Sequence, residues 1–329
     1  MIDKQSRRRA KTASSRVAAL LACMVLSGTG VAWGANADAL QQGITETGLN
    51  IWTISSTPLT ASVKVDEAAH NALPKSIRES GVLKIGAITD EPPFIFIKNG
   101  NLQGIDIDMM GGLARALGIK IELHKTSFEG MIPGLKADRF DVVMGDLTDT
   151  APREKIVDFV DYIKNEQTIM VKQNETRDFS TPLSVCGHSA AAPKASLSAR
   201  ITEELSDICV KKGLKPITLE SYPSSAQVFL ALETGRVDVS PITYAIAVYL
   251  QKQDPGKYAI TNSLFYQSYK GAAVLKDQPA LFKALTTGFQ AVISSTNYDQ
   301  VLSYWGLEKL KNDKVYVNVP GKPLDETIK

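Results

Sequence analysis

Beyond its first forty residues, the sequence has no apolar run of the about 20 residues that a membrane-spanning helix needs. Excess charge is also missing, because 37 basic side chains nearly balance 35 acidic ones, and this balance gives no support for a nucleic-acid partner. Histidine and cysteine number three each, and none of them has the spacing of metal ligands. The sequence therefore predicts a soluble globular protein without a metal, a cofactor or bound nucleic acid.

The first 37 residues have the three-part pattern of an export signal. Basic residues gather between Arg7 and Arg16, the short apolar segment 17–26 follows, and Ala35-Asn36-Ala37 fits a signal-peptidase site. We expect residues 1–37 to be a signal peptide that is cleaved near Ala37, which places the mature protein in the periplasm. The alternative is a surface helix or a membrane anchor. Ser6-Arg7-Arg8 also leaves twin-arginine export open beside the general route.

Few cysteines remain once the signal is removed. Cys23 lies within the signal, which leaves Cys186 and Cys209. In an exported protein an even pair of cysteines is read first as a disulfide, with two free thiols as the alternative. Catalysis by a cysteine is disfavoured because no histidine stands out as its base.

The remaining chain changes in composition near Leu73. Residues 38–72 are polar and show no clear periodicity, so we expect an N-terminal extension, with the ordered fold starting at Leu73-Pro74. From there, strands alternate with amphipathic helices, which is typical of an α/β fold with a largely parallel sheet. The first block of expected elements comprises helix 75–80, strand 82–88, hairpin 94–103, helix 105–117, strand 119–124, helix 131–137 and strand 140–144.

The alternation then repeats in a second block. Its expected elements are strand 189–192, helix 197–212, strand 216–219, helix 224–234, strand 237–239 and helix 244–253, and after them strand 272–275 and helices 279–294 and 298–305. Two blocks of this kind predict two Rossmann-like lobes with a ligand cleft between them, at the carboxyl ends of their strands. The predicted boundaries are 73–170 with 268–312 for lobe 1, 171–267 for lobe 2, and 313–329 for a C-terminal tail. A hinge of two chain crossings, near Ile169–Gln173 and Tyr266–Lys270, is expected to join the lobes.

A series of short motifs follows the same order along the chain. They include Gly81-Val82-Leu83-Lys84-Ile85-Gly86, Pro92-Pro93-Phe94, Gly104-Ile105-Asp106-Ile107-Asp108, Thr148-Asp149-Thr150-Ala151-Pro152-Arg153, Gly235-Arg236-Val237-Asp238 and Tyr304-Trp305-Gly306-Leu307. With them the chain, from Leu73 to about Leu310, resembles the extracellular solute-binding proteins of polar-amino-acid ABC importers, which have the type II periplasmic binding protein fold. The resemblance implies a monomer that binds a small polar solute, an amino acid or a derivative, and delivers it to a membrane permease.

Arg153 is the first candidate for ligand binding. In proteins that this chain resembles, the matching arginine grips the α-carboxylate of the ligand, because a planar guanidinium donates two parallel hydrogen bonds to a carboxylate. Taken alone, Arg153 could equally be a solvated residue beside Glu154. Thr148 lies five residues earlier and has a hydroxyl that is suited to the polar head of the ligand.

Other candidates lie on the first lobe. Asp146 stands where the family usually has Gly or Ser, and its carboxylate suits a cationic group, although it could also cap the following turn. Phe128 is expected to stack on the ligand, with a core position as the alternative. Asp90 and Glu91 follow the first strand and lie at the mouth of the expected cleft, where ordinary solvated loop residues are also common.

The second lobe departs from the family pattern at two places. Ser196, after Ala195, stands where the family usually has Gly-Thr and a backbone amide meets the carboxylate. Thr243 stands where an aspartate usually holds the ligand ammonium, and a neutral threonine cannot offset a buried ammonium as a carboxylate does. Asp146 or Glu91 replaces that aspartate, or the ligand is not a standard α-amino acid.

An enzymatic function is the main alternative. The same fold hosts periplasmic cyclohexadienyl-type dehydratases that act on prephenate-like acids, and Glu91 could be the acid that protonates a leaving group. We find one candidate acid and no partner for it, so binding for transport is favoured and no catalytic residue is assigned. A sensory module of a receptor is disfavoured because the sequence has no transmembrane or signalling segment.

Overall fold

The structure is a computed structural model that describes residues 44–48, 51–261, 263–322, 324 and 328. The expected signal peptide, its cleavage near Ala37 and Cys23 lie outside the described residues. All described residues belong to one compact unit, Asn36–Lys329.

A parallel arrangement of three strands forms the centre of the first group of elements. β3 (Val82–Ala87) pairs in parallel with both β7 (Lys120–Lys125) and β8 (Val142–Val143). Leu83 and Ile85 of β3 are fully buried, which explains the almost continuous apolar character of this strand. The predicted strands 82–88, 119–124 and 140–144 are thereby confirmed within a few residues.

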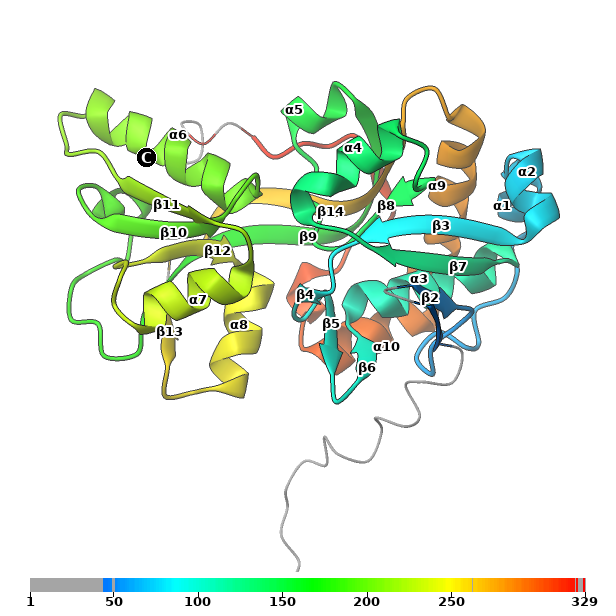
Figure 1. Ribbon diagram of the computed structural model, residues 1–329, viewed down its shortest axis with the longest axis horizontal. Coiled ribbons are helices and arrows are strands. Elements are labelled where there is room, and N and C mark those ends of the chain that lie inside the picture. Colours follow the sequence, from blue (N-terminus) through cyan, green and yellow to red (C-terminus); the bar gives the residue numbers. More distant parts are fainter. Residues whose placement is uncertain (1–43, 49–50, 262, 323, 325–327, 329) are drawn as a thin grey trace, which may run out of the picture. The chain divides into compact units, whose positions relative to one another are not determined.

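Helices cover both faces of these strands (Figure 1). On one face, α3 (Ile105–Leu117) packs against α9 (Pro279–Ile293) and α10 (Thr296–Trp305). On the other face lies α4 (Met131–Lys136), whose Met131 and Leu135 are buried against the sheet. α3 ends at Gly118, which adopts a left-handed conformation with φ of 64°, as a C-terminal glycine permits.

The segment before Leu73 belongs to the fold. β1 (Ile44–Gly48) and β2 (Ile51–Ile54) extend the sheet beyond β7 by antiparallel pairing, and α1 (Glu67–Ala72) precedes α2 (Lys75–Ser80). Ile54 is fully buried, so these strands contribute to the core. The expectation that ordered structure begins at Leu73 is therefore wrong. The strands are too short for a periodicity to stand out, and only their pairing with β7 makes them stable.

Two long antiparallel strands run between the two groups of elements (Figure 1). β9 (Val157–Lys172) pairs with β14 (Phe265–Leu275) along most of its length. At its far end, β9 also pairs with β12 (Ser240–Thr243) and β13 (Tyr258–Ile260), so that both groups share one sheet. β9 was not predicted from the sequence, because polar residues are mixed with apolar ones along its 16 residues.

The second group of elements repeats the α/β pattern. β10 (Ser189–Pro193) and β11 (Thr218–Tyr222) are parallel and pack against α6 (Leu197–Lys211) and α7 (Ser225–Glu233). α8 (Tyr244–Gln253) packs against β9, β12 and β13. The expected strand 237–239 is reduced to one bridge between Val239 and Ala190, and β12 follows it. The α/β fold class is confirmed. The strands at the centre of each group are parallel, whereas the long shared strands are antiparallel.

Small elements complete the structure. A three-stranded sheet is formed by β4 (Asp90–Glu91), β5 (Ile95–Lys98) and β6 (Asn101–Gln103), which confirms the expected hairpin. α5 (Ala151–Glu154) precedes β9, and β15 (Tyr316–Val317) pairs with it. Leu324 is buried in the core of the second group, and Ile328 packs against the same core.

The predicted disulfide is present. It joins Cys186 to Cys209, 23 residues apart, and so ties the start of the second group to the buried side of α6. The prediction of a disulfide is thereby confirmed.

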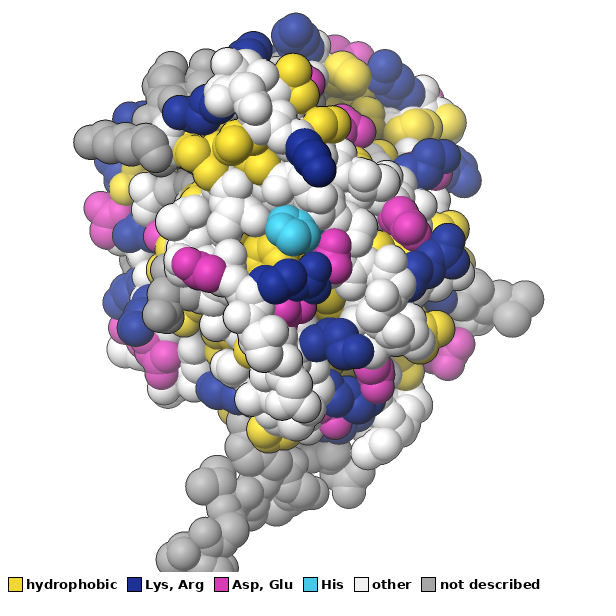
Figure 2. All heavy atoms as spheres, turned by 90° about the vertical axis from the view of Figure 1, so that its left-hand side faces the viewer, with side chains coloured by type: hydrophobic (Ala, Val, Ile, Leu, Met, Phe, Trp, Pro, Cys, Tyr) yellow, Lys and Arg dark blue, Asp and Glu magenta, His cyan; other side chains and the backbone are white. Residues whose placement is uncertain are grey.

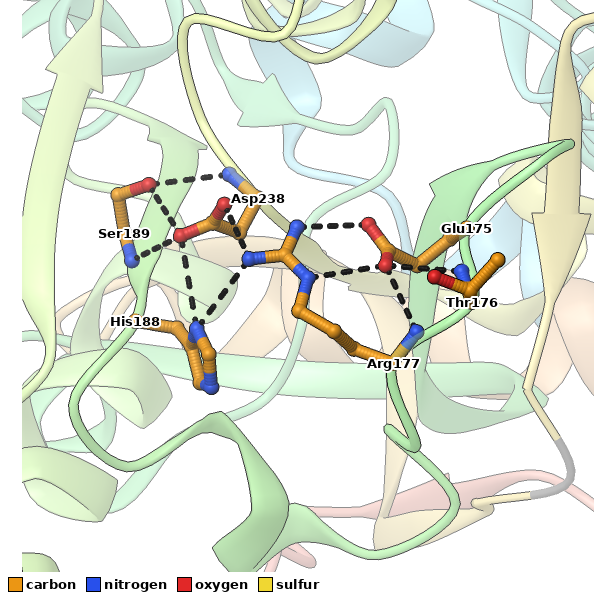
Figure 3. Close-up of polar contacts among 6 residues, drawn as sticks. All are labelled: Glu175, Thr176, Arg177, His188, Ser189 and Asp238. Carbon is orange, nitrogen blue, oxygen red and sulfur yellow. Dashed lines mark hydrogen bonds and ion pairs between the residues drawn. The ribbon is translucent and has the colours of Figure 1, made fainter.

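Asp238 of the Gly-Arg-x-Asp motif has a structural role in the second group (Figure 3). Its carboxylate accepts hydrogen bonds from the backbone and hydroxyl of Ser189, and Arg177 donates to it from the loop after β9. Burial alone would raise the pKa of Asp238, but these hydrogen bonds outweigh it and lower the pKa to about 2. The face formed by this end of the molecule shows basic and acidic side chains interspersed (Figure 2), in keeping with the small net charge.

Candidate functional site

A cavity of about 420 Å³ lies where the first group of elements faces the second. Its size is within the range of small-molecule sites. All predicted site residues except Arg153 line it, namely Asp90, Glu91, Phe128, Asp146, Thr148, Ser196 and Thr243. Hydroxyl groups form much of the wall on the side of the second group, where Ser196, Ser198, Ser224, Ser225 and Ser240 contribute to it.

The loop after β8 carries two of these side chains. Asp146 has a left-handed backbone, with φ of 52°, and its N–H donates to Oδ2 of Asp106 at 2.9 Å. The other oxygen of Asp106 accepts a hydrogen bond from the Tyr162 hydroxyl at 2.7 Å. Burial raises the pKa of Asp106 to about 7, although the Tyr162 hydroxyl opposes the rise. Asp106, at the start of α3, thus fixes the loop that presents Asp146 and Thr148.

Lys270 is a site residue that was not predicted from the sequence. It lies on β14, and its side chain is only 2% exposed at the cavity wall. Its Nζ is 2.6 Å from Oδ1 of Asp146, and it also donates to the backbone oxygen of Asp146 at 3.2 Å and to Oγ1 of Thr243 at 3.3 Å. A lysine inside a strand that becomes apolar directly after it, at 272–275, was the available signal.

This arrangement changes the interpretation of Asp146 and Thr243. Burial raises the pKa of Asp146, and the ammonium of Lys270 opposes that rise. Thr243 precedes α8, and its hydroxyl also accepts a hydrogen bond from Nε2 of Gln167 at 3.3 Å. Both residues are therefore already engaged with side chains of the protein.

Glu91 is buried, with 7% of its surface exposed, and it borders the cavity. It forms a short hydrogen bond with the hydroxyl of Ser225, the first residue of α7, on the opposite wall. No ion pair involves Glu91 in the described part of the chain. Burial, and next the nearby charge of Asp146, raise the pKa of Glu91 to about 8. Asp90, beside it, is exposed.

Arg153 lines a second pocket, which adjoins the cavity because both are lined by Ser196 and Leu197. Its guanidinium donates to the backbone oxygen of Thr148 at 2.8 Å and, across the gap, to that of Ala195 at 3.2 Å. It also lies 5.1 Å from the ring centre of Phe128. Burial, and next the charge of Arg200, lower the pKa of Arg153 to about 10, so the group is still a cation near neutral pH.

Two further site features are polar groups near Arg153. The hydroxyl of Thr148 is buried and has no hydrogen-bond partner among the described residues. Ser196 caps α6, because its Oγ accepts a hydrogen bond from the N–H of Ala199 at 3.1 Å. The site therefore combines a half-buried guanidinium, a free hydroxyl and the N-terminus of a helix, a set of donors that suits an anionic group.

The described residues contain neither a metal-binding cluster nor a membrane-spanning helix. No group of three or more His, Cys, Asp or Glu side chains there is arranged to hold a metal ion. None of the helices within those ranges has the length and apolar character to cross a bilayer.

The sequence and the fold both match known proteins. Residues 83–308 match the family described as bacterial extracellular solute-binding proteins, family 3. The arginine-binding protein ArgT of Corynebacterium glutamicum is 24% identical over 253 residues, which cover 75% of this chain and 81% of that protein. The L-cystine-binding protein TcyJ of Escherichia coli is 25% identical over 246 residues, which cover 70% and 85%.

Solved structures with the same fold include two that are described as ancestral proteins. An ancestral arginine-binding protein bound to arginine is 28% identical and has a TM-score of 0.62. The match covers 68% of this chain and 98% of that protein. An ancestral amino acid-binding protein, described as a precursor of cyclohexadienyl dehydratase, is 27% identical with a TM-score of 0.61. The match covers 70% of this chain and 97% of that protein.

Proposed function

The chain belongs to family 3 of the bacterial extracellular solute-binding proteins, and we propose that it binds an amino acid and delivers it to the permease of an ABC importer. Relatives named for binding arginine and cystine support an amino acid as the solute class. The solute would lie in the cavity that is bordered by Glu91, Thr148 and Ser196.

The observation that carries this proposal is the state of Arg153. Its guanidinium is half-buried, and no carboxylate of the described residues forms an ion pair with it. One of its donors is used on the backbone oxygen of Ala195 at 3.2 Å, a neutral acceptor. A solute carboxylate that replaced this contact would give the cation a charged partner and accept a second hydrogen bond from Thr148 or Ser196. Arg153 is thus proposed as the carboxylate-binding residue.

Closure of two lobes would bury the solute. The proposed lobes are residues 73–170 with 268–312, and 171–267, and the proposed hinge uses the crossings near Ile169–Gln173 and Tyr266–Lys270. Their location within β9 and β14, which the two groups of elements share, supports this assignment. Small-angle scattering is expected to give a smaller radius of gyration at saturation with solute, and an unchanged radius would contradict closure.

Export to the periplasm is part of the same proposal. The family is extracellular by its description, and the pattern in residues 1–37 supports a signal peptide that is cleaved near Ala37. A monomer would then meet the permease at the membrane surface. The mass of protein purified from the periplasm tests the cleavage site, because removal of residues 1–37 leaves Asp38 as the first residue.

Native mass spectrometry of protein purified without refolding tests the binding function. We expect a bound solute with the mass of an amino acid, and a higher melting temperature when that compound is added to protein stripped of it. A screen of amino acids and organic acids that finds no binder of the stripped, folded protein would contradict the proposal.

A dehydratase is the second candidate function. The pKa of about 8 keeps Glu91 protonated at neutral pH, as a general acid requires, and one structural relative is described as a precursor of cyclohexadienyl dehydratase. Incubation with prephenate distinguishes the two functions. Binding for transport predicts no turnover, whereas catalysis that is lost in Glu91→Gln would favour the enzyme.

A further inference from the structure

We propose that Glu91 is the residue that holds the positively charged group of the solute, and that binding of this group releases a proton from the site. The inference rests on the proposed function, since it names the solute class as an amino acid that presents an ammonium or a guanidinium to Glu91 while Arg153 holds its carboxylate. Three observations about the charges of the cavity support it.

The first observation is that Asp146 already has a cation. The ammonium of Lys270 has three donors, and three acceptors surround it: a carboxylate oxygen and the backbone oxygen of Asp146, and the hydroxyl of Thr243. A second cation at Asp146 would have to lie beside the first one without a second acid to balance it. Asp146 and Thr243 are thus not available to a solute cation.

The second observation is that Glu91 lacks such a partner. It is buried at the cavity wall, its hydrogen-bonding partner is the neutral hydroxyl of Ser225, and it belongs to no ion pair within the described ranges. A buried carboxylate without a counter-charge is unfavourable, and a protein corrects this by protonating it or by pairing it. Before a solute binds, Glu91 is protonated, and its raised pKa of about 8 agrees with this state.

The third observation is that the wall opposite Glu91 offers room without competing charge. Ser225, Val228 and Phe229 of α7 line the cavity there, and none of these side chains is ionisable. The charged groups that act on Glu91 are Asp146 and Asp90, which favour its neutral form, and Lys270, which favours its ionised form. A solute cation would add a second positive charge at contact distance, and Glu91 would ionise when the solute binds.

The protonation change makes the affinity for a cationic solute depend on pH. The neutral carboxyl must lose its proton before it can accept a cation, so the affinity for such a solute falls as the pH drops below the pKa of the empty site. For one group with a pKa of about 8, the expected gain in affinity from pH 6 to pH 8 is about fiftyfold, with a plateau above pH 8. Buried Asp106, whose pKa is about 7, contributes no cation-binding group to the cavity, because its carboxylate accepts hydrogen bonds from the backbone of Asp146 and from Tyr162. It titrates in the wild type and in Glu91→Gln alike, so a comparison of the two proteins isolates the contribution of Glu91.

Calorimetry on the mature protein and Glu91→Gln tests this account. The probes are L-arginine, L-citrulline, which lacks the side-chain charge, 5-guanidinopentanoate, which lacks the α-ammonium, and glutarate, which has no cation. The variant should fold normally, because glutamine resembles the protonated acid. Glu79→Gln, on the exposed face of α2, controls for the loss of one negative charge.

For the tightest cationic probe, Glu91→Gln is expected to lower affinity about thirtyfold at pH 8 and to abolish both the pH dependence and the release of a proton. The probe that loses affinity identifies the group that Glu91 holds. Equal affinities and proton counts in the wild type and Glu91→Gln would overturn the proposal, and so would a preference for glutarate over every cationic probe. Binding of L-arginine or L-citrulline that depends on Arg153 but not on Glu91 would leave the proposed function intact, whereas failure of all solutes to bind would remove both.

Discussion

Lys270 and Asp146 form a buried ion pair, with Nζ of the lysine 2.6 Å from Oδ1 of the aspartate. The pair connects β14, one of the two strands that both groups of elements share, to the loop that presents Thr148. It thereby decides which acids of the cavity can act on a solute. Asp146 is neutralised within the protein, and Glu91 is the buried acid at the cavity wall that remains without a cation in the described part of the chain.

Lys270→Met tests the importance of this pair for stability. The substitution leaves Asp146 buried without its counter-charge, which typically costs about 3–5 kcal/mol in the free energy of unfolding. The double variant Lys270→Met/Asp146→Asn is expected to recover a large part of the loss, because no charge is then left unpaired. Urea unfolding of the wild type, Lys270→Met, Asp146→Asn and the double variant measures the coupling energy between the two residues. Additive effects of the two substitutions on the free energy of unfolding would contradict the ion pair's role in stability.

The disulfide should be present and stabilising in the mature protein. A closed loop of 23 residues is expected to contribute about 3 kcal/mol by limiting the unfolded chain. The double variant Cys186→Ser/Cys209→Ser should therefore unfold at lower urea concentration than the wild type. A thiol assay on the unfolded, unreduced protein should detect no free thiol, and two titratable thiols would contradict the pairing.

Asp238 predicts a dependence of stability on acid pH. Its pKa is about 2 in the folded protein and 3.8 is the ordinary value, so the folded state favours the ionised carboxylate. The stability that it contributes, on the order of 1 kcal/mol once solvent screening of this partly exposed group is taken into account, is present above about pH 4 and is lost as the pH falls toward 2. Asp238→Asn should thus destabilise the protein at pH 7 and have little effect at pH 2. Unfolding curves at both pH values measure the difference, and an equal loss at both would contradict this account.

The sequence was sufficient for the features that local patterns encode. Gly118 after a helical repeat predicted the end of α3, and the Asn99-Gly100 turn predicted the hairpin of β5 and β6. The cavity wall was also largely predicted, because its residues follow strands whose carboxyl ends meet.

Features that depend on distant contacts were missed. β1 and β2 are stable through their pairing with each other and with β7, and the composition of residues 38–72 does not reveal this. Lys270 is 124 residues from Asp146, so no local pattern relates them. The interpretation of Thr243 from the sequence was therefore incomplete. Its hydroxyl accepts a hydrogen bond from the ammonium of Lys270, whereas the sequence alone shows only a threonine at a position where the family usually has an aspartate.

Calorimetric titration of Arg153→Ala and Arg153→Lys with the amino acid that native mass spectrometry identifies is the most direct test of the binding site. If Arg153 holds the carboxylate, the alanine variant is expected to bind at least about thirtyfold more weakly, because removal of one partner of a desolvated pair costs about 2–5 kcal/mol. The lysine variant should also bind weakly, since an ammonium cannot form the two parallel hydrogen bonds of a guanidinium. If folded Arg153→Ala binds this amino acid as tightly as the wild type, Arg153 does not hold the carboxylate.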